Sequence, residues 1–123
     1  MKQLEMFHDG KVKQLYLTDD EDRIIIRYKD AVTAFNNVKK ATIVNKGVLN
    51  NKISGIIFKY LREAGIESHY IETLNDRDQL CRRVEVIPLE VIVRNVVAGS
   101  MAKRLGLKEG TKPTNVIYDI CYK

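Results

Sequence analysis

The stretch from residue 86 to residue 100 constrains the fold of this chain more than any other part of it. Its centre, residues 91–93, is continuously apolar and β-branched, which predicts a strand buried on both faces. Pro88 restricts the path into that strand, because proline cannot donate a ladder hydrogen bond. After the strand, an Ala-Gly-Ser turn leads into a short helix, residues 101–105, that we expect Gly106 to close. The order predicts a strand–turn–helix junction of the kind at which α/β folds bind ligands.

Two residues of this junction are candidate ligand-binding groups. Arg94 would offer a fork of donors to a carboxylate or a phosphate. Ser100 would cap the helix that follows and leave backbone N–H groups for an anion. The residues alone leave a second interpretation open, in which Arg94 forms a structural ion pair and Ser100 is an ordinary N-cap.

The rest of the chain predicts an α+β fold. Residues 11–29 form a hairpin with an acidic turn at residues 19–22, which turn chemistry explains without a metal. A helix follows from Val48, and Gly65 takes the left-handed position after its last turn. The helix is indicated by apolar residues that recur on one face, namely Leu49, Ile53, Ile56, Ile57, Tyr60 and Leu61.

Beyond this helix, the pattern predicts a strand at residues 67–74, a short helical turn from Asn75 to Leu80 and a last strand at residues 116–122. Residues 36–46 are polar and show no clear period. We therefore expect a small antiparallel-sheet lobe with one long helix, residues 1–81. The start of a second α/β lobe follows at residues 82–123, with too few elements to cover both faces of its strand.

Composition narrows the class of protein. The chain of 123 residues is 45% hydrophobic and 30% charged, which is typical of a soluble globular protein. No apolar run approaches the ~20 residues of a membrane helix, and no signal peptide is evident, so we expect a cytoplasmic protein. Cys81 and Cys121 lie far apart and are expected to be free thiols. His8 and His69 show no triad pattern, and His69 is expected to be a packing residue.

The net charge of +5 fits either a small polyanionic substrate or nucleic acid. The basic residues are scattered among sixteen acidic ones, and no stacking motif accompanies them, so nucleic acid is the weaker alternative. The charge by itself does not decide between the two.

Residues 86–100 resemble the signature of the SAICAR synthetase (phosphoribosylaminoimidazole-succinocarboxamide synthase) family. Nine positions match in register: Ile87, Pro88, Leu89, Glu90, Val93, Arg94, Ala98, Gly99 and Ser100. Residues 10–13, Gly-Lys-Val-Lys, are similar to the family's Gly-Lys-Ala-Lys element, with Val12 in place of alanine. Further matches are Thr33-Ala34-Phe35, Lys46-Gly47 and Asn50-Asn51, whereas Asn37 replaces a usual glycine. The resemblance extends over residues 10–123.

This resemblance implies a kinase-like or ATP-grasp-like N-lobe and a ligase of purine biosynthesis. The family joins L-aspartate to carboxyaminoimidazole ribotide, using ATP and magnesium, through an acyl phosphate. The implied partners are these small molecules, with no nucleic acid and no membrane. The alternative is a non-catalytic nucleotide-binding or interaction module that retains only the small lobe.

The resemblance also implies roles for individual residues. The turn formed by Gly10, Lys11, Val12 and Lys13 would hold the ATP phosphates. The linker would meet adenine through its backbone at Arg82, Val84, Glu85 and Val86. Arg94 and Ser100 would bind the ribotide or the aspartate, Lys46 and Asn50 would border the ribotide pocket, and Lys123 would be a further active-site lysine.

The family's chains are about twice as long as this one, and their second signature, Asp-x-Lys-x-Glu-Phe-Gly, has no counterpart here. We therefore expect no metal ligands within this chain, with Mg²⁺ held by the other half, and a half-enzyme that does not turn over alone. Apolar faces around residues 91–97 would be exposed and could force self-association into a homo-oligomer.

Overall fold

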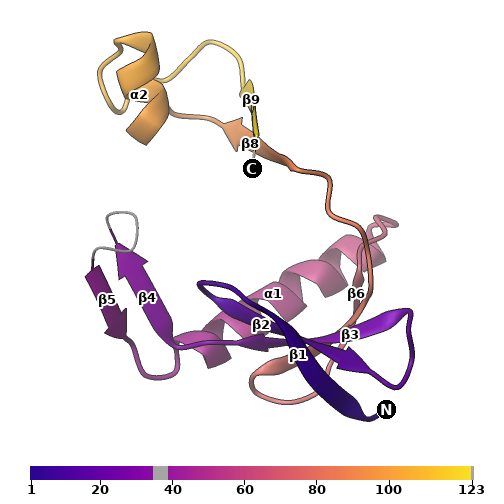
Figure 1. The fold of residues 1–123 in the computed structure, drawn as a ribbon. Helices are drawn as coiled ribbons and strands as arrows, with labels where there is room; N and C mark the ends of the chain where they lie inside the picture. Colours follow the sequence, from indigo (N-terminus) through magenta and orange to yellow (C-terminus); the bar gives the residue numbers. More distant parts are fainter. Residues whose placement is uncertain (35–38, 123) are drawn as a thin grey trace. The chain divides into compact units, whose positions relative to one another are not determined.

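The computed structural model describes residues 1–34 and 39–122. The chain divides into two compact units, Met1–Val84 and Glu85–Lys123 (Figure 1). Antiparallel sheets and two helices make up the described residues, which confirms the predicted α+β class.

The first unit is built on a five-stranded sheet with the order β1-β2-β3-β7-β6. Its strands are β1 (Gln3–Asp9), β2 (Lys13–Thr18), β3 (Arg23–Tyr28), β7 (Asp78–Arg82) and β6 (Tyr70–Thr73), and every neighbouring pair is antiparallel. The predicted hairpin is β2–β3, and its acidic turn is closed by hydrogen bonds from Thr18 Oγ1 to the carbonyl oxygens of Asp20 and Arg23. Strand β1 was not predicted, because all seven of its residues are exposed and show no regular alternation.

The centre of this sheet is buried on both faces. Ile24, Ile26 and Tyr28 of β3 cluster with Cys81 of β7, and Val12 and Leu15 pack against them. On the opposite face Ile25 lies directly across from Leu80, and both are buried. The continuous apolar run in β3 therefore reflects a strand with neighbours on both sides.

Helix α1 (Lys46–Glu63) lies along the sheet (Figure 1) and confirms the predicted helix. Gly65 has a φ of +79° and donates its amide hydrogen to Arg62, and Ile66 donates to Leu61. This pair of bonds is the Schellman motif, in which glycine accepts a left-handed conformation without strain.

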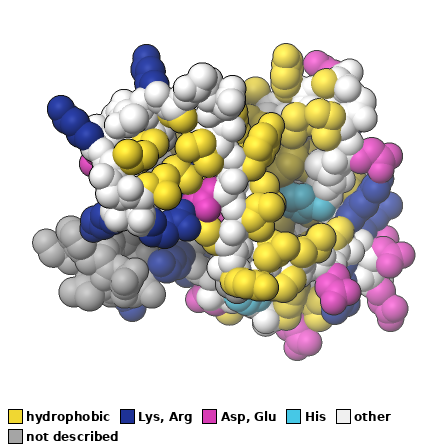
Figure 2. All heavy atoms as spheres, turned by 90° about the horizontal axis from the view of Figure 1, so that it is seen from above, with side chains coloured by type: hydrophobic (Ala, Val, Ile, Leu, Met, Phe, Trp, Pro, Cys, Tyr) yellow, Lys and Arg dark blue, Asp and Glu magenta, His cyan; other side chains and the backbone are white. Residues whose placement is uncertain are grey.

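The apolar stripe of α1 does not face the sheet. The helix buries Gly47, Asn51 and Gly55, while Ile56 is 68% exposed. The other stripe residues that are more than half exposed are Leu49, Ile53, Ile57 and Tyr60. Figure 2 shows hydrophobic side chains reaching the surface on the face that it presents. The helix approaches the sheet through its small residues: a Cβ added to Gly55 would lie 2.9 Å from the Thr73 hydroxyl oxygen.

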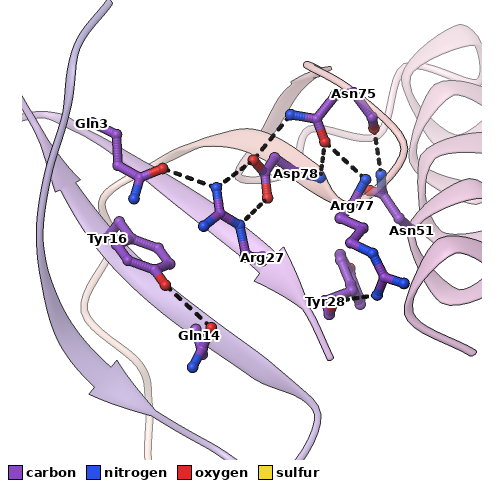
Figure 3. A network of polar contacts seen from close by, with 9 residues as sticks. All are labelled: Gln3, Gln14, Tyr16, Arg27, Tyr28, Asn51, Asn75, Arg77 and Asp78. Atoms are coloured by element: carbon purple, nitrogen blue, oxygen red, sulfur yellow. Dashed lines mark hydrogen bonds and ion pairs between the residues drawn. The ribbon is translucent and has the colours of Figure 1, made fainter. Parts of the chain in front are cut away.

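The helical turn predicted from Asn75 to Leu80 is wrong. Asn75 Oδ1 accepts hydrogen bonds from the amides of Arg77 and Asp78, at 2.8 and 2.9 Å, which makes a tight turn between β6 and β7 (Figure 3). Asp78 then receives both 2.8 Å hydrogen bonds of the Arg27 guanidinium. The segment pairs as a central strand because β3 offers it an apolar neighbour fifty residues away in sequence.

A second hairpin, β4 (Ala31–Ala34) and β5 (Lys39–Thr42), precedes α1. It was not predicted, because β4 has only four residues and β5 lies in the polar stretch of residues 36–46, which shows no clear period. Phe35 and Asn37, which belong to a stretch compared with the family, lie outside the described residues.

The second unit contains β8 (Leu89–Arg94), α2 (Gly99–Leu105) and β9 (Ile117–Tyr122). Gly106 closes α2 with a φ of +64°, as predicted. Strand β8 pairs antiparallel with β9. On one face of this pair, Leu89, Val91, Val93, Tyr118, Ile120 and Tyr122 are 40–92% exposed.

The expectation that residues 91–93 are buried on both faces is therefore wrong for the described part of the chain, since Val91 is 66% and Val93 is 58% exposed. The apolar face of β8 and β9 is exposed because the buried apolar residues of this unit, Val97 and Met101, lie in the turn after β8 and in α2.

Candidate functional site

The turn from Gly10 to Lys13 is tightly fixed by backbone contacts. The Gly10 amide donates to the Lys13 carbonyl oxygen at 2.8 Å, and the Lys29 amide donates to Val12 at 2.7 Å. Lys29 Nζ adds hydrogen bonds to Asp9, at 2.8 Å, and to the Gly10 carbonyl oxygen, at 3.1 Å. Val12 anchors the turn on the apolar cluster, whereas Lys11 and Lys13 are exposed and can reach an anion.

A hollow of about 360 Å³ lies between this turn and α1. Val12, Lys13 and Tyr28 line it from the sheet, and the helix contributes Asn50, Ile53, Ser54, Ile57 and Phe58. Lys13 Nζ lies 5.2 Å from the centre of the Tyr28 ring, a cation–π distance. The structure thus brings together three sequence-predicted residues, Val12, Lys13 and Asn50.

Burial and nearby charge shift the pKa values of two side chains near the hollow, His69 and Cys81. Burial lowers the pKa of His69, and the positive charge of Lys13 acts in the same direction. Burial raises the pKa of the Cys81 thiol to about 11. His69 packs edge-on against Phe58 at 5.1 Å, which agrees with the packing role expected of it.

Lys46 is not among the residues that line this hollow. Its Nζ donates to the Ala31 carbonyl oxygen at 2.9 Å, which ties the start of α1 to β4. Its neighbour Gly47 donates to the Asp30 carboxylate. The side chain of Lys46 therefore has a structural contact, and its predicted role at the ribotide pocket stays a prediction.

The linker residues Arg82 and Val84 line a second hollow, of about 560 Å³, with Asp20, Asp22, Arg23, Ile71 and Arg83. The Arg82 amide donates to His69 and the Arg83 amide donates to Asp22, each at 2.7 Å. Glu85 and Val86 follow as exposed residues at the start of the second unit.

In the second unit, Arg94 Nε donates to Asp119 Oδ2 at 3.3 Å, and Arg104 Nη2 donates to the same oxygen at 2.6 Å. Burial raises the pKa of Asp119, but the hydrogen bonds from Arg104 and Arg94 outweigh it and leave the pKa below its usual range. The ion pair that the sequence left open for Arg94 is present. Asp119 and Arg104 were not predicted from the sequence, although an aspartate among the apolar residues of the last strand is a usable signal.

Ser100 does not cap α2. The N-cap residue is Ala98, which makes no side-chain capping bond, and Ser100 is the second helical residue, exposed at the surface. The first helical amide, that of Gly99, donates instead to Glu109 Oε1 at 3.2 Å. The turn places Gly99 at a φ of +57°, and the helix begins two residues earlier than the sequence suggested. Lys123 lies outside the described residues.

Within residues 1–34 and 39–122, no three His, Cys, Asp or Glu side chains gather as a metal site requires, so these residues do not fit a magnesium site of their own. No helix in the same part of the chain is long and apolar enough to cross a membrane.

The family model of SAICAR synthetase matches residues 6–123. Phosphoribosylaminoimidazole-succinocarboxamide synthases from Fusobacterium nucleatum and Clostridium perfringens are 58% identical over the whole chain, which spans 52% of each relative. The solved enzyme from Ehrlichia chaffeensis is 41% identical with a TM-score of 0.92, over 97% of this chain and 50% of that one. A SAICAR synthetase in complex with ADP is 43% identical with a TM-score of 0.88, over 94% and 49% of the two chains. This chain therefore belongs to the SAICAR synthetase family and spans about half the length of the relatives it matches.

Proposed function

We propose that the protein to which this sequence belongs ligates L-aspartate to carboxyaminoimidazole ribotide at the expense of ATP, in purine biosynthesis in the cytoplasm. The observation that carries this proposal is the Gly10–Lys13 turn, which has two exposed lysines, one of them, Lys13, lining a hollow, in a chain 58% identical to named synthases. A relative of the same fold is known in complex with ADP, which supports ATP as a substrate.

In this proposal residues 1–81 cover the nucleotide. Lys11 and Lys13 attract the phosphates, while the tightly bonded turn keeps Gly10 and Val12 in place close to them. The linker meets adenine through its backbone at Arg82, Val84, Glu85 and Val86. Asn50 shares the hollow with Lys13. In this proposal Asn50 and Lys46 border the ribotide.

Residues 82–123 supply part of the second wall. Arg94 binds an anionic group of the ribotide or of the aspartate, Ser100 offers a hydroxyl beside it, and Lys123 adds a further positive charge. This half of the site has a bare apolar face, which the remaining half of the family chain would cover. Until it is covered, the same face favours association of this chain into a homo-oligomer.

The chemistry requires positive charge more than a strong base. A carboxylate oxygen of the ribotide attacks the γ-phosphorus of ATP, the bond to ADP breaks, and an acyl phosphate forms. The amine of aspartate then attacks the acyl carbon, and phosphate leaves with the bonding electrons. Lys11 and Lys13 oppose the charge that accumulates on the phosphoryl oxygens. Magnesium would accompany ATP; no step is assigned to it, since the described residues do not fit a magnesium site.

The test is titration of the isotope-labelled 123-residue chain with magnesium-ATP, followed by amide NMR. We expect shifts at residues 10–13 and 82–86, and a weakening of binding by about tenfold in Lys13→Met, since one charge-assisted contact is lost. Lys59→Met, a matched loss of charge on an exposed helix residue, should leave binding unchanged. Binding that both variants leave intact would contradict the assignment of Lys13.

Product formation separates the ligase from its alternative, a nucleotide-binding module without catalysis. The 123-residue chain alone should form no SAICAR, because it holds one wall of the site. Addition of the remaining half of a relative's chain should restore turnover that depends on Lys13. Restored nucleotide binding without any ligation would favour the non-catalytic module, and steady-state turnover by the chain alone would overturn the half-site proposal.

A further inference from the structure

Asp119 connects three elements of the second unit. It lies on β9, and its Oδ2 accepts hydrogen bonds from Arg94, at the end of β8, and from Arg104, in the last turn of α2. Its Oδ1 receives a 3.6 Å contact from the Cys121 thiol, a weak donor. Both guanidinium groups are therefore held at one carboxylate oxygen.

The charges at this cluster do not balance. Two guanidinium groups and one carboxylate leave a formal charge of +1. One arginine would be enough to neutralise Asp119, and the second adds repulsion between the two guanidinium groups. A bound anion would remove that excess charge, so the cluster carries the charge that an anion site requires in addition to its internal ion pairs.

Exposure indicates the side from which an anion would enter. The side chains of Asp119 and Arg94 are 10% and 19% exposed, whereas that of Arg104 is 52% exposed. Arg94 uses its Nε for Asp119, and a guanidinium has further N–H donors that can bind an oxyanion. The carboxylate thus lies at the buried end of the cluster, and the excess positive charge lies toward solvent.

The backbone around the cluster is well fixed. The Val97 amide donates to Thr111 and the Gly110 amide donates to Val97, each at 2.8 Å. Val97, in the turn that joins β8 to α2, and Met101, in α2, are both buried. Because both arginines sit on supported elements, Asp119 can fix their guanidinium groups before a ligand arrives.

We propose that Asp119 is a positioning residue that holds Arg94 and Arg104 as a paired guanidinium site for an oxyanion, with Arg104 as a second anion-binding residue. The inference rests on the proposed function for the ligand's origin, which is a phosphate or a carboxylate group of a substrate. The pairing itself rests on contacts within the second unit.

The test uses the 123-residue chain and the side-chain Nε–H signals of its arginines. Inorganic phosphate and L-aspartate are titrated separately, so that the two sources of oxyanion are distinguished. One of them should shift the Arg94 and Arg104 signals together, at a single dissociation constant. Arg104→Gln should weaken that binding by about fivefold or more, as expected for loss of a charge-assisted hydrogen bond. Lys103→Met, which removes the same charge from a neighbouring exposed position of α2, should change it little.

Asp119→Asn provides the decisive comparison. The substitution raises the net charge by one, so simple attraction between charges predicts tighter anion binding. Positioning predicts the opposite: weaker binding, together with faster hydrogen exchange at Arg94 Nε. If signals from Val97 and Met101 show that this variant disturbs the fold, Arg104→Lys replaces it, and it should weaken binding although the charge is kept.

Tighter binding in a folded Asp119→Asn variant would overturn the inference, as would an Arg104→Lys variant that binds as well as the parent chain. Failure of both anions to shift either arginine would also overturn it. These outcomes leave the nucleotide site at residues 10–13 unaffected, so failure here is distinguishable from failure of the proposed function. Loss of magnesium-ATP binding with an intact paired site would leave this inference standing.

Discussion

The backbone amide of Gly47 donates a 2.8 Å hydrogen bond to the carboxylate of Asp30. The same carboxylate accepts two hydrogen bonds from Arg77, at 2.8 and 2.9 Å. Asn45, at the helix N-cap, makes no side-chain capping bond, so Asp30 takes over that role from outside the helix. This contact fixes the start of α1, and with it Asn50 at the hollow beside Lys13.

Gly47→Ala should destabilise the first unit by about 1–3 kcal/mol, the usual cost of overpacking. A Cβ at this position would lie 2.5 Å from the Tyr28 carbonyl oxygen, and backbone cannot move away cheaply. Urea unfolding measures the change. Gly55→Ala is the matched control on the same helix face, because its Cβ would meet a side-chain atom, the Thr73 hydroxyl oxygen at 2.9 Å, rather than backbone. Equal effects at the two positions would contradict this account.

Asp78→Asn should make the free energy of unfolding of this chain depend less on pH in the acidic range. Burial raises the pKa of Asp78, but the hydrogen bonds from Arg27 and Asn75 outweigh it and leave the pKa below its usual range (Figure 3). A lowered folded pKa means that the folded state binds fewer protons. The contribution is therefore present above the unfolded pKa of about 3.9 and is lost as pH falls below it, through the folded value.

At neutral pH the same variant should cost about 1–3 kcal/mol, less than a fully buried pair, because Arg27 is 36% exposed. Chemical unfolding between pH 2 and pH 7 measures both effects. Asp76→Asn is the control, since Asp76 is exposed and lies two residues away. If the free energy of unfolding of Asp78→Asn fell with acid as steeply as that of the parent chain, the role of this ion pair would be contradicted.

Ile56→Gln should change the stability of this chain by no more than about 0.5 kcal/mol, because the side chain is 68% exposed. It should also reduce any self-association that the exposed stripe promotes. Ile26→Ala, in the buried cluster, should cost about 2–5 kcal/mol by contrast. Urea unfolding and sedimentation check the two variants. A large loss in Ile56→Gln would mean that α1 packs through its apolar stripe after all.

A thiol reagent such as DTNB should modify Cys121 well before Cys81 in the native chain. Cys81 is fully buried, and burial raises its pKa to about 11, so very little thiolate forms at pH 8. Cys121 is partly exposed. Cys121→Ser should abolish the early reaction, and unfolding in urea should make Cys81 reactive. Early modification of Cys81 would contradict its place in the core.

Elements whose signals are local can be predicted from the amino-acid sequence. Three features depend only on residues close together in the sequence: the apolar period of α1, the glycines that end both helices and the β2–β3 hairpin. Propensity and spacing therefore suffice to predict them. The family resemblance likewise predicted, from the chain alone, binding roles for residues 10–13 and Arg94.

Features that depend on partners distant in the sequence could not be predicted and are seen only in the folded chain. Residues 75–82 form a turn and a strand because β3 pairs with them. Helix α1 places its small residues against the sheet because the helix lies too close to its neighbours at Gly47 and Gly55 for larger side chains. Only folding brings Asp119 into contact with Arg94 and Arg104. The sequence had suggested a role for Arg94 but not for Arg104. Local periodicity encodes the type of an element, whereas pairing is set by burial and charge between segments far apart in the chain.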